Sequence, residues 1–120
     1  MEPKIKIIYY TTTQGENPVS DFLDSLSESQ QAKILRILTY MKDYGISSVL
    51  PHVKKLTGVP LWEIRILGRD NIRVFYVMPT GHTVLVLHGF IKKKQKTPLK
   101  EIAIAIGRLA DWEKAKPLDK

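Results

Sequence analysis

Residues 61–91 read LWEIRILGRDNIRVFYVMPTGHTVLVLHGFI, and this stretch decides the fold. It contains three runs rich in β-branched and aromatic residues, at 61–67, 71–78 and 83–91, which is typical of strands. Glycine-containing segments lie between the runs and are short enough to form hairpin turns. The stretch therefore predicts three consecutive antiparallel strands.

The flanking segments predict one more strand and three helices. A β-prone run at 4–13 comes first. Asn-Pro at 17–18 predicts the start of a short helix, and Ser27 resembles the first residue of a capping box that begins a second one. After a connector at 46–60 and the three strands, Thr-Pro at 97–98 predicts the start of a third helix.

The predicted order is therefore β-α-α-β-β-β-α, an α+β fold with a small antiparallel sheet. The two N-terminal helices are amphipathic and are expected to cover one face of the sheet. The first strand is expected to join the sheet, although its neighbour there stays open. The other face is expected to remain partly exposed to solvent. We expect one domain over residues 1–120, with a frayed end at 112–120.

Composition excludes several kinds of site and points to an anionic partner. The chain has no cysteine, which excludes disulfides, cysteine-based zinc sites and a cysteine nucleophile. No membrane-spanning run or secretory signal is apparent, so the cytoplasm is the expected location and no membrane partner is expected. Residues 50–100 carry ten Lys/Arg and two Asp/Glu, a net of +8, while the whole chain carries +7. Nucleic acid is the commonest partner of such a basic segment.

Strand alternation assigns side chains to the two faces of the predicted sheet. In the first of the three strands, Ile64 and its apolar neighbours must face the helices, so Glu63 and Arg65 point to the opposite, solvated face. Arg73 belongs to that face by the same reasoning, and Phe75 with it. Both sides of the last strand are apolar, so its alternation leaves the orientation of His88 open.

These residues form a candidate cluster for binding a phosphate backbone. Its candidate catalytic residues are Lys54, Lys55, Glu63, Arg65, Arg73 and His88, and its candidate RNA-binding residues are Lys92, Lys93, Lys94, Lys96, Phe75 and Phe90. Aromatic rings beside cations are typical of single-stranded RNA recognition. Each residue also has a structural interpretation: the glutamate as one half of a surface ion pair, the lysine run as a solvated segment, the histidine as part of the core. No residue pattern has metal-ligand spacing.

Several segments resemble the RelE/ParE toxin superfamily, and most of all its HigB-like, phage-derived branch. They are KKLTG at 54–58, LWEIR at 61–65, RVFY at 73–76, LHGFIKK at 87–93, KTP at 96–98 and EI at 101–102. The resemblance covers roughly residues 4–112, and 87–98 is its most specific part. It implies a RelE-like fold and the toxin of a type II toxin–antitoxin system.

In the RelE and HigB branches, the resemblance implies a metal-free endoribonuclease that cuts mRNA on the ribosome and needs no cofactor. The ribose 2′-OH attacks the adjacent phosphate, and cationic side chains meet the charge that develops. The implied partner is a small antitoxin with a helix-turn-helix domain, and the complex of both proteins binds operator DNA. By position, the matching residues are Lys54 and Lys55 in the loop, Arg65 and Arg73 on strands, and Lys92 and Lys93 at the end of the last strand.

The sequence departs from the RelE pattern at one position and leaves two other functions open. RelE has a tyrosine in a C-terminal basic segment, and this chain has none between Lys92 and Lys120. His88, His52 or Glu63 would then supply the acid or base. The ParE branch inhibits DNA gyrase instead, and a non-catalytic RNA-binding module would need the same cations, because one fold supports different functions.

Overall fold

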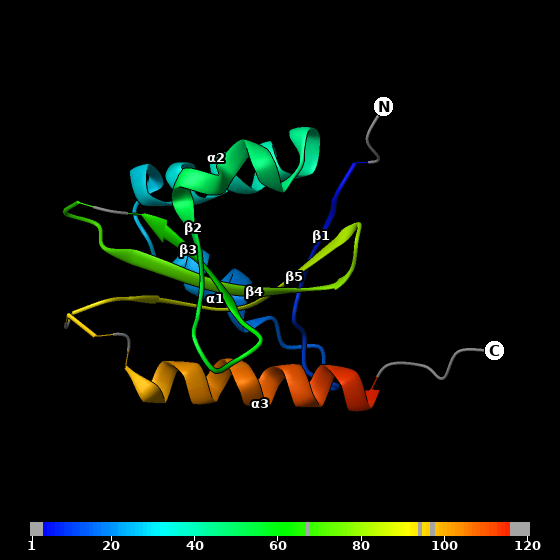
Figure 1. The fold of residues 1–120 in the computed structure, drawn as a ribbon. Helices are drawn as coiled ribbons and strands as arrows, with labels where there is room; N and C mark the ends of the chain where they lie inside the picture. The colour runs from blue at the N-terminus through cyan, green and yellow to red at the C-terminus, as the bar shows by residue number, and fades with distance from the viewer. Residues whose placement is uncertain (1–3, 67, 94, 97, 116–120) are drawn as a thin grey trace.

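The computed structural model describes residues 4–66, 68–93, 95–96 and 98–115, and Figure 1 shows its fold. Its elements, in chain order, are β1 (Lys6–Tyr9), α1 (Pro18–Asp24), α2 (Glu28–Tyr44), the 3-10 helix η1 (Ile46–His52), β2 (Val53–Lys55), β3 (Trp62–Ile66), β4 (Ile72–Thr80), β5 (Thr83–Ile91) and α3 (Leu99–Ala115). The predicted α+β class is confirmed. None of the helices in the described ranges is long and apolar enough to cross a membrane.

The five strands form one sheet in the order β1-β5-β4-β3-β2. Strands β2 to β5 are antiparallel to their neighbours, which confirms the predicted three-strand core of the sheet. β1 joins at the edge, parallel to β5. The structure adds β2, which comes from the segment predicted as a connector, and η1 immediately before it.

Local sequence signals explain where the N-terminal helices begin. The side chain of Asn17 accepts a hydrogen bond from the Ser20 backbone N–H, as expected of an N-cap. Ser27 and Gln30 form the reciprocal bonds of a capping box at the start of α2. α2 ends at Gly45, whose φ of 87° favours glycine. Thr97, the predicted cap of the last helix, lies outside the described residues.

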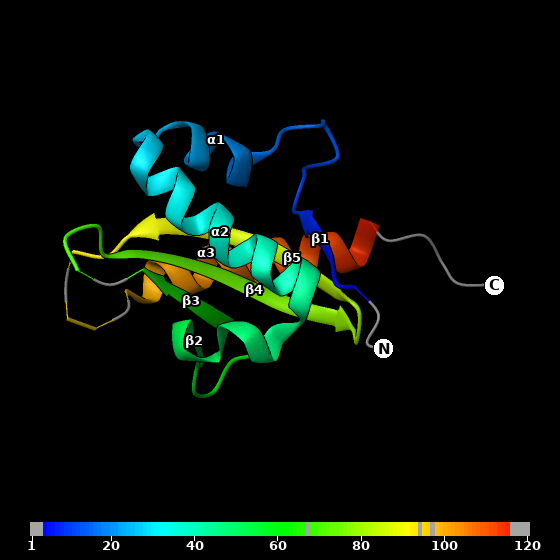
Figure 2. The same cartoon turned by 90° about the horizontal axis from the view of Figure 1, so that it is seen from above.

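Helices cover both faces of the sheet (Figures 1 and 2). α1 and α2 lie over one face, where the apolar side chains of β3, including Ile64 and Ile66, form the larger core. α3 covers the opposite face, so the expectation that this face is open to solvent is wrong. The alternation was assigned correctly, but most side chains on this face, such as Phe75, Val77 and Leu85, are apolar and need a cover.

The helix that covers this face is α3, and it continues through Ala115, beyond residue 112 where fraying was expected. Trp112 packs against the second core, together with Ile102, Ile106 and Leu109. Residues 116–120 lie outside the described part of the chain. A helix with one apolar face over a sheet is stabilised by that packing more than by its own propensity.

A register shift between β4 and β5 decides which way His88 points. Phe75 pairs with His88, whereas the next residue, Tyr76, pairs with Val86, so Leu87 is the extra residue of a β-bulge. Leu87 packs in the core beneath α3 and the His88 ring contacts α3, so two consecutive residues face the same side. Strict alternation, which the sequence reasoning assumed, does not hold at this point.

The close fit of α1 against β5 depends on a glycine. A Cβ atom at Gly89 would come within 2.5 Å of the Phe22 ring of α1. The bare backbone at this position therefore lets α1 approach the sheet directly beside the bulge.

Candidate functional site

A buried pair of opposite charges lies on the face covered by α3. Arg73 Nε lies 3.8 Å from Glu63 Oε2, and each side chain is only 4% exposed. Neither of these two atoms has a hydrogen-bond partner among the described residues, and Arg73 Nη1 donates to the carbonyl of Ile72 at 3.1 Å. Burial lowers the pKa of Arg73, and the nearby charge of Glu63 opposes that shift. Each charge therefore depends on the other to offset its desolvation.

Arg73 also lines a small basic pocket, made of Asn71, Arg73, Lys92, Lys93 and Gln95, with a volume of about 250 Å³. Three of these five residues are cationic and none is acidic. The Asn71 side chain donates to the Lys92 carbonyl at 2.6 Å, and the Lys92 backbone N–H donates to the Asn71 carbonyl at 2.8 Å. These two bonds hold the end of β5 against the start of β4, so the lysines are presented from a fixed backbone. The pocket can bind an anion such as a phosphate.

Two further predicted cations lie on the same side of the sheet as this pair. Arg65 is the register partner of Arg73, and Lys54 is the partner of Glu63, so all four belong to neighbouring positions of β2, β3 and β4. Arg65 is half-buried and Lys54 is exposed. Directly paired residues of antiparallel strands project to the same face. The structure therefore brings Arg65, Arg73 and Lys54 together.

The other predicted lysines do not join this group. Lys55 pairs with Trp62, which faces the α2 side, and its Nζ donates to the carbonyls of Val59 and Leu56 at 2.6 and 3.2 Å. Lys96 is exposed beyond the end of β5, and Lys94 lies outside the described residues. Lys55 therefore stabilises its own loop.

The two predicted base-stacking rings are buried. Phe75 is fully buried and Phe90 nearly so, with ring centroids 5.2 Å apart. The His88 ring stacks on Phe90 at 5.5 Å. The prediction that these phenylalanines stack on a nucleotide base therefore does not fit, because α3 covers both rings. They form the apolar surround of His88.

Both ring nitrogens of His88 are occupied by α3. Its Nε2 lies 2.6 Å from Glu101 Oε1, and its Nδ1 lies 3.2 Å from Nη1 of Arg108. Because a guanidinium only donates, Nδ1 must accept, and Nε2 carries the proton that it donates to Glu101. Burial lowers the pKa of His88, which favours this neutral form, although Glu101 opposes the shift. His88 thus anchors α3 and does not face solvent.

Further polar contacts hold α3 along its length. Arg108 donates to the Leu87 carbonyl at 2.9 Å and lies over the Tyr10 ring. Tyr10 donates its hydroxyl hydrogen to Asp111 at 2.6 Å. Sequence reasoning singled out none of these three side chains. Arg108 and Asp111 share a helix face with Glu101, at seven and ten residues' spacing, and that spacing was the available signal.

A second basic cavity, called here the helix cleft, lies between α2, the end of η1 and β3. Its lining residues are Lys33, Arg36, Ile37, Tyr40, His52, Arg65 and Ile66, and its volume is about 470 Å³. The four α2 residues recur at a helical spacing of three, four and seven, which places them on one face. From this set, sequence reasoning named only His52 and Arg65 as candidate functional residues.

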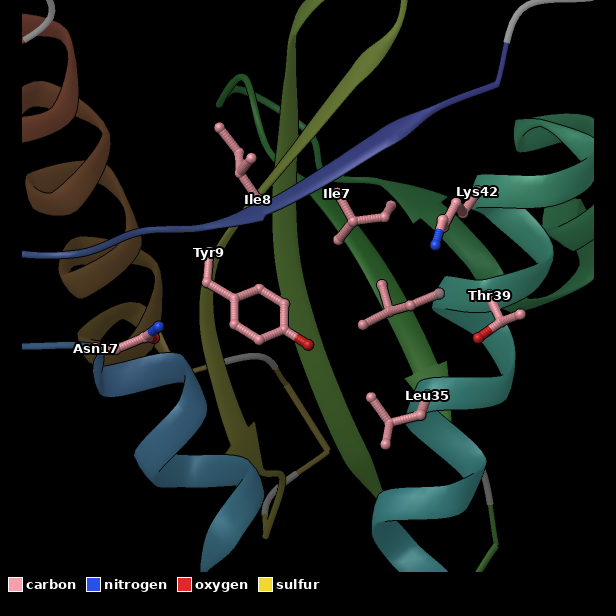
Figure 3. Close-up of a pocket in the computed structure, with 8 residues that line it drawn as sticks. Ile7, Ile8, Tyr9, Asn17, Leu35, Thr39 and Lys42 are labelled. Atoms are coloured by element: carbon pink, nitrogen blue, oxygen red, sulfur yellow. The ribbon is translucent and has the colours of Figure 1, made fainter.

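An apolar groove on the opposite edge of the sheet is of similar size, about 490 Å³. It lies between β1, α1 and α2, and Figure 3 shows its lining residues. These are Ile7, Ile8, Tyr9, Asn17, Leu35, Leu38, Thr39 and Lys42. With a single cation in its lining, this groove lacks the charge of the two basic cavities. Within the described ranges, no three His, Asp or Glu side chains are grouped so that they could hold a metal ion.

Comparison with known proteins identifies the family of the chain. The family model described as phage derived protein Gp49-like (DUF891) matches residues 21–110, three quarters of the chain. A comparison with curated proteins found no match. The matched range runs from α1 into α3 and includes the buried pair and the basic pocket. The chain therefore belongs to the phage-derived Gp49-like family, which is part of the RelE/ParE-like toxin superfamily.

Proposed function

We propose that this protein is the toxin of a type II toxin–antitoxin system, of the HigB-like branch, and that it cleaves mRNA on the ribosome. Membership of the Gp49-like family supports a toxin. The observation that carries the choice of an RNA target is the basic pocket, where Arg73, Lys92 and Lys93 converge with no acidic residue in the lining. A phosphodiester is the group that such a pocket suits best.

In the proposed reaction, the ribose 2′-OH attacks the adjacent phosphorus and the 5′-oxygen leaves. Arg73, Lys92 and Lys93 stabilise the extra negative charge of the pentacoordinate phosphorane, a role that does not need a metal ion. Glu63 keeps Arg73 in place but is itself buried, so the proton of the 2′-OH passes to solvent water. A lysine ammonium of the pocket then protonates the leaving oxygen. His88 serves the site indirectly, because α3 occupies both of its nitrogens.

The proposed partners are those of a toxin that acts on translation. They are the ribosome with its mRNA, and a cognate antitoxin, with operator DNA contacted only through the complex of both proteins. We therefore propose that the activity is cytoplasmic. Co-expression of the antitoxin gene is expected to restore growth to cells that the toxin arrests. Continued arrest in the presence of every neighbouring small gene product would argue against the pair.

The deciding experiment maps mRNA 5′ ends after induction of the protein. We expect new ends within coding regions in the wild type, and few in the Lys92→Gln/Lys93→Gln variant. Each lost phosphate contact should cost about 2–4 kcal/mol of transition-state stabilisation, or roughly 30- to 900-fold in rate. Lys42→Gln is the matched control, because this exposed lysine lines the apolar groove on the opposite edge of the sheet. Growth arrest with intact transcripts and altered DNA supercoiling would instead identify a gyrase inhibitor.

A further inference from the structure

We propose that the helix cleft binds the base of one unpaired nucleotide of the RNA against Tyr40, with a neighbouring phosphate held by Arg36 and Arg65. This inference rests on the proposed function, since it concerns the same RNA strand. It assigns a role to Tyr40 and Arg36, which the cleavage step does not use. The cleft would therefore add to binding and to the choice of nucleotide, without taking part in the chemistry.

The cleft offers an apolar floor and an aromatic wall. Ile37 and Ile66 are buried at its base, whereas Tyr40 is 45% exposed. A large ring that keeps almost half of its surface in water contributes little to the core. The Tyr40 ring rests against the Tyr44 ring, with centroids 6.1 Å apart, so it has a neighbour that limits its movement. An exposed and supported ring of this kind is a platform for base stacking.

The charges around this wall suit a phosphate. Four lining residues are cationic or can become so, and none is acidic. Lys33 forms a salt bridge with Asp70, but neither Arg36 nor Arg65 forms an ion pair within the described part of the chain. Arg36 and Arg65 thus line the cavity without a carboxylate partner in the described part of the chain. Guanidinium groups bind phosphate oxygens in a bidentate manner and are less strongly hydrated than ammonium groups.

The helix cleft and the basic pocket are adjacent through a single strand pair. Arg65 lines the cleft, and its register partner Arg73 lines the pocket. Paired residues of antiparallel strands have Cα atoms only about 4.5–5.5 Å apart. One RNA strand that crosses the edge of β3 can therefore contact both cavities with successive nucleotides. An acidic peptide would satisfy the charges but has no planar base to place on Tyr40, so we commit to RNA.

The test measures binding of a short single-stranded RNA to the purified full-length protein by fluorescence anisotropy. The RNA carries 2′-O-methyl groups, which remove the attacking hydroxyl and prevent cleavage. We expect Tyr40→Ala to weaken binding at least about five-fold, and Tyr40→Phe to retain wild-type affinity because it keeps the ring. Leu35→Ala is the matched control: this α2 side chain is 43% exposed, close to the 45% of Tyr40, and lines the apolar groove instead of the cleft.

A second arm replaces the bases of the RNA by abasic sites. If the base stacks on Tyr40, the abasic RNA should bind the wild type and Tyr40→Ala equally weakly. Arg36→Gln should weaken both RNAs, whereas Lys42→Gln on another face of the same helix should weaken neither. Equal affinity of Tyr40→Ala and wild type for the normal RNA would overturn the inference.

The proposed function is tested by transcript cleavage, which is measured separately from RNA binding. Loss of transcript cleavage in Lys92→Gln/Lys93→Gln, with no effect of Tyr40→Ala on RNA binding, would remove the nucleotide subsite and leave the nuclease in place. Cleavage at the wild-type rate in the double lysine variant would remove the proposed catalytic pocket. Because the two proposals depend on different residues and different readouts, neither failure can be mistaken for the other.

Discussion

Glu63 and Arg73 lie side by side beneath α3, and their two facing atoms are buried without a hydrogen bond. At 3.8 Å the contact is too long for a hydrogen bond, so the pair is held by charge alone and by the arginine's bond to the Ile72 carbonyl. Buried pairs of this kind are often weaker than apolar packing would be. The pair is therefore better explained by a role in holding Arg73 at the basic pocket than by stability.

Breaking the pair should destabilise the fold, and removing it completely should not. Glu63→Gln leaves the Arg73 charge buried without a partner, so we expect the free energy of unfolding to fall by about 3–5 kcal/mol. The double variant Glu63→Leu/Arg73→Met should recover most of that loss while abolishing RNA cleavage. Urea denaturation measures the first effect. Asp70→Asn, which breaks the more exposed pair with Lys33, is the control and should change stability much less.

His88 should make stability depend on pH in a defined direction. Its pKa lies below the usual 6.5 in the folded protein, mainly because of burial. Below about pH 6.5 the unfolded chain therefore binds a proton that the folded protein does not, and stability is lost as the pH falls. The groups that face the ring are Glu101 and Arg108 of α3.

Thermal unfolding between about pH 5 and pH 8 measures this dependence. We expect His88→Gln to show a flatter slope than the wild type, whatever its absolute stability. His82→Gln is the control, because this exposed histidine lies in the β4–β5 turn and should keep the wild-type slope. An unchanged slope in His88→Gln would contradict the assignment of a neutral folded histidine.

Among the elements, β5 shows best what the sequence could and could not predict. Its strand character, its neighbour β4 and the faces of β3 and β4 follow from composition and alternation alone. The bulge at Leu87 cannot be predicted in this way, because one extra residue in a strand does not change the local β-strand propensity. For the same reason His88 could not be oriented, and the cover over Phe75 and Phe90 was missed. The amphipathic pattern of α3 indicates that one side of the helix is buried, but it does not indicate which surface that side packs against. Tertiary packing decides this, and here α3 covers the sheet face that carries Phe75 and Phe90.

The contact of α1 with β5 predicts contrasting effects for two glycine substitutions. Gly89→Ala places a Cβ atom against the Phe22 ring, and overpacking of this kind costs about 1–3 kcal/mol. Gly81→Ala, in the turn before the same strand, meets no atom within 4 Å and should be close to neutral. Chemical denaturation of the two variants in parallel checks the prediction. Equal stabilities would mean that α1 moves away from the sheet at little cost.

Over the whole molecule, four of the ten cationic residues between 50 and 100 lie at one end of the sheet. Arg65, Arg73, Lys92 and Lys93 come from three strands and meet where β3 turns into β4 and where β5 ends. The charge asymmetry and these four residues were predictable from the sequence. The contribution of α2 to this basic region was not predictable from the sequence. Arg36 and Tyr40 lie far from the basic segment along the chain, and only the fold brings them to Arg65.

This distribution predicts how salt affects binding. For single-stranded RNA, the logarithm of the binding constant should fall with the logarithm of salt concentration by about 0.7 per neutralised phosphate. Lys92→Gln/Lys93→Gln should make that slope shallower by roughly 1 to 1.5, which corresponds to two lost phosphate contacts. Lys42→Gln should leave it unchanged. A salt titration of RNA binding gives the slopes, and parallel lines for all three proteins would contradict a role for these lysines.

The extra residue at Leu87 ties the length of β5 to the order of its side chains. Deleting Leu87 would restore regular pairing with β4, because Val86 and His88 already pair with consecutive residues of that strand, but it would remove a fully buried side chain from the core beneath α3. Deleting His88 instead would leave Leu87 or Gly89 opposite Phe75, and Glu101 would lose its imidazole partner. We therefore expect proteins with this fold to tolerate substitutions in β5 more readily than insertions or deletions in that strand.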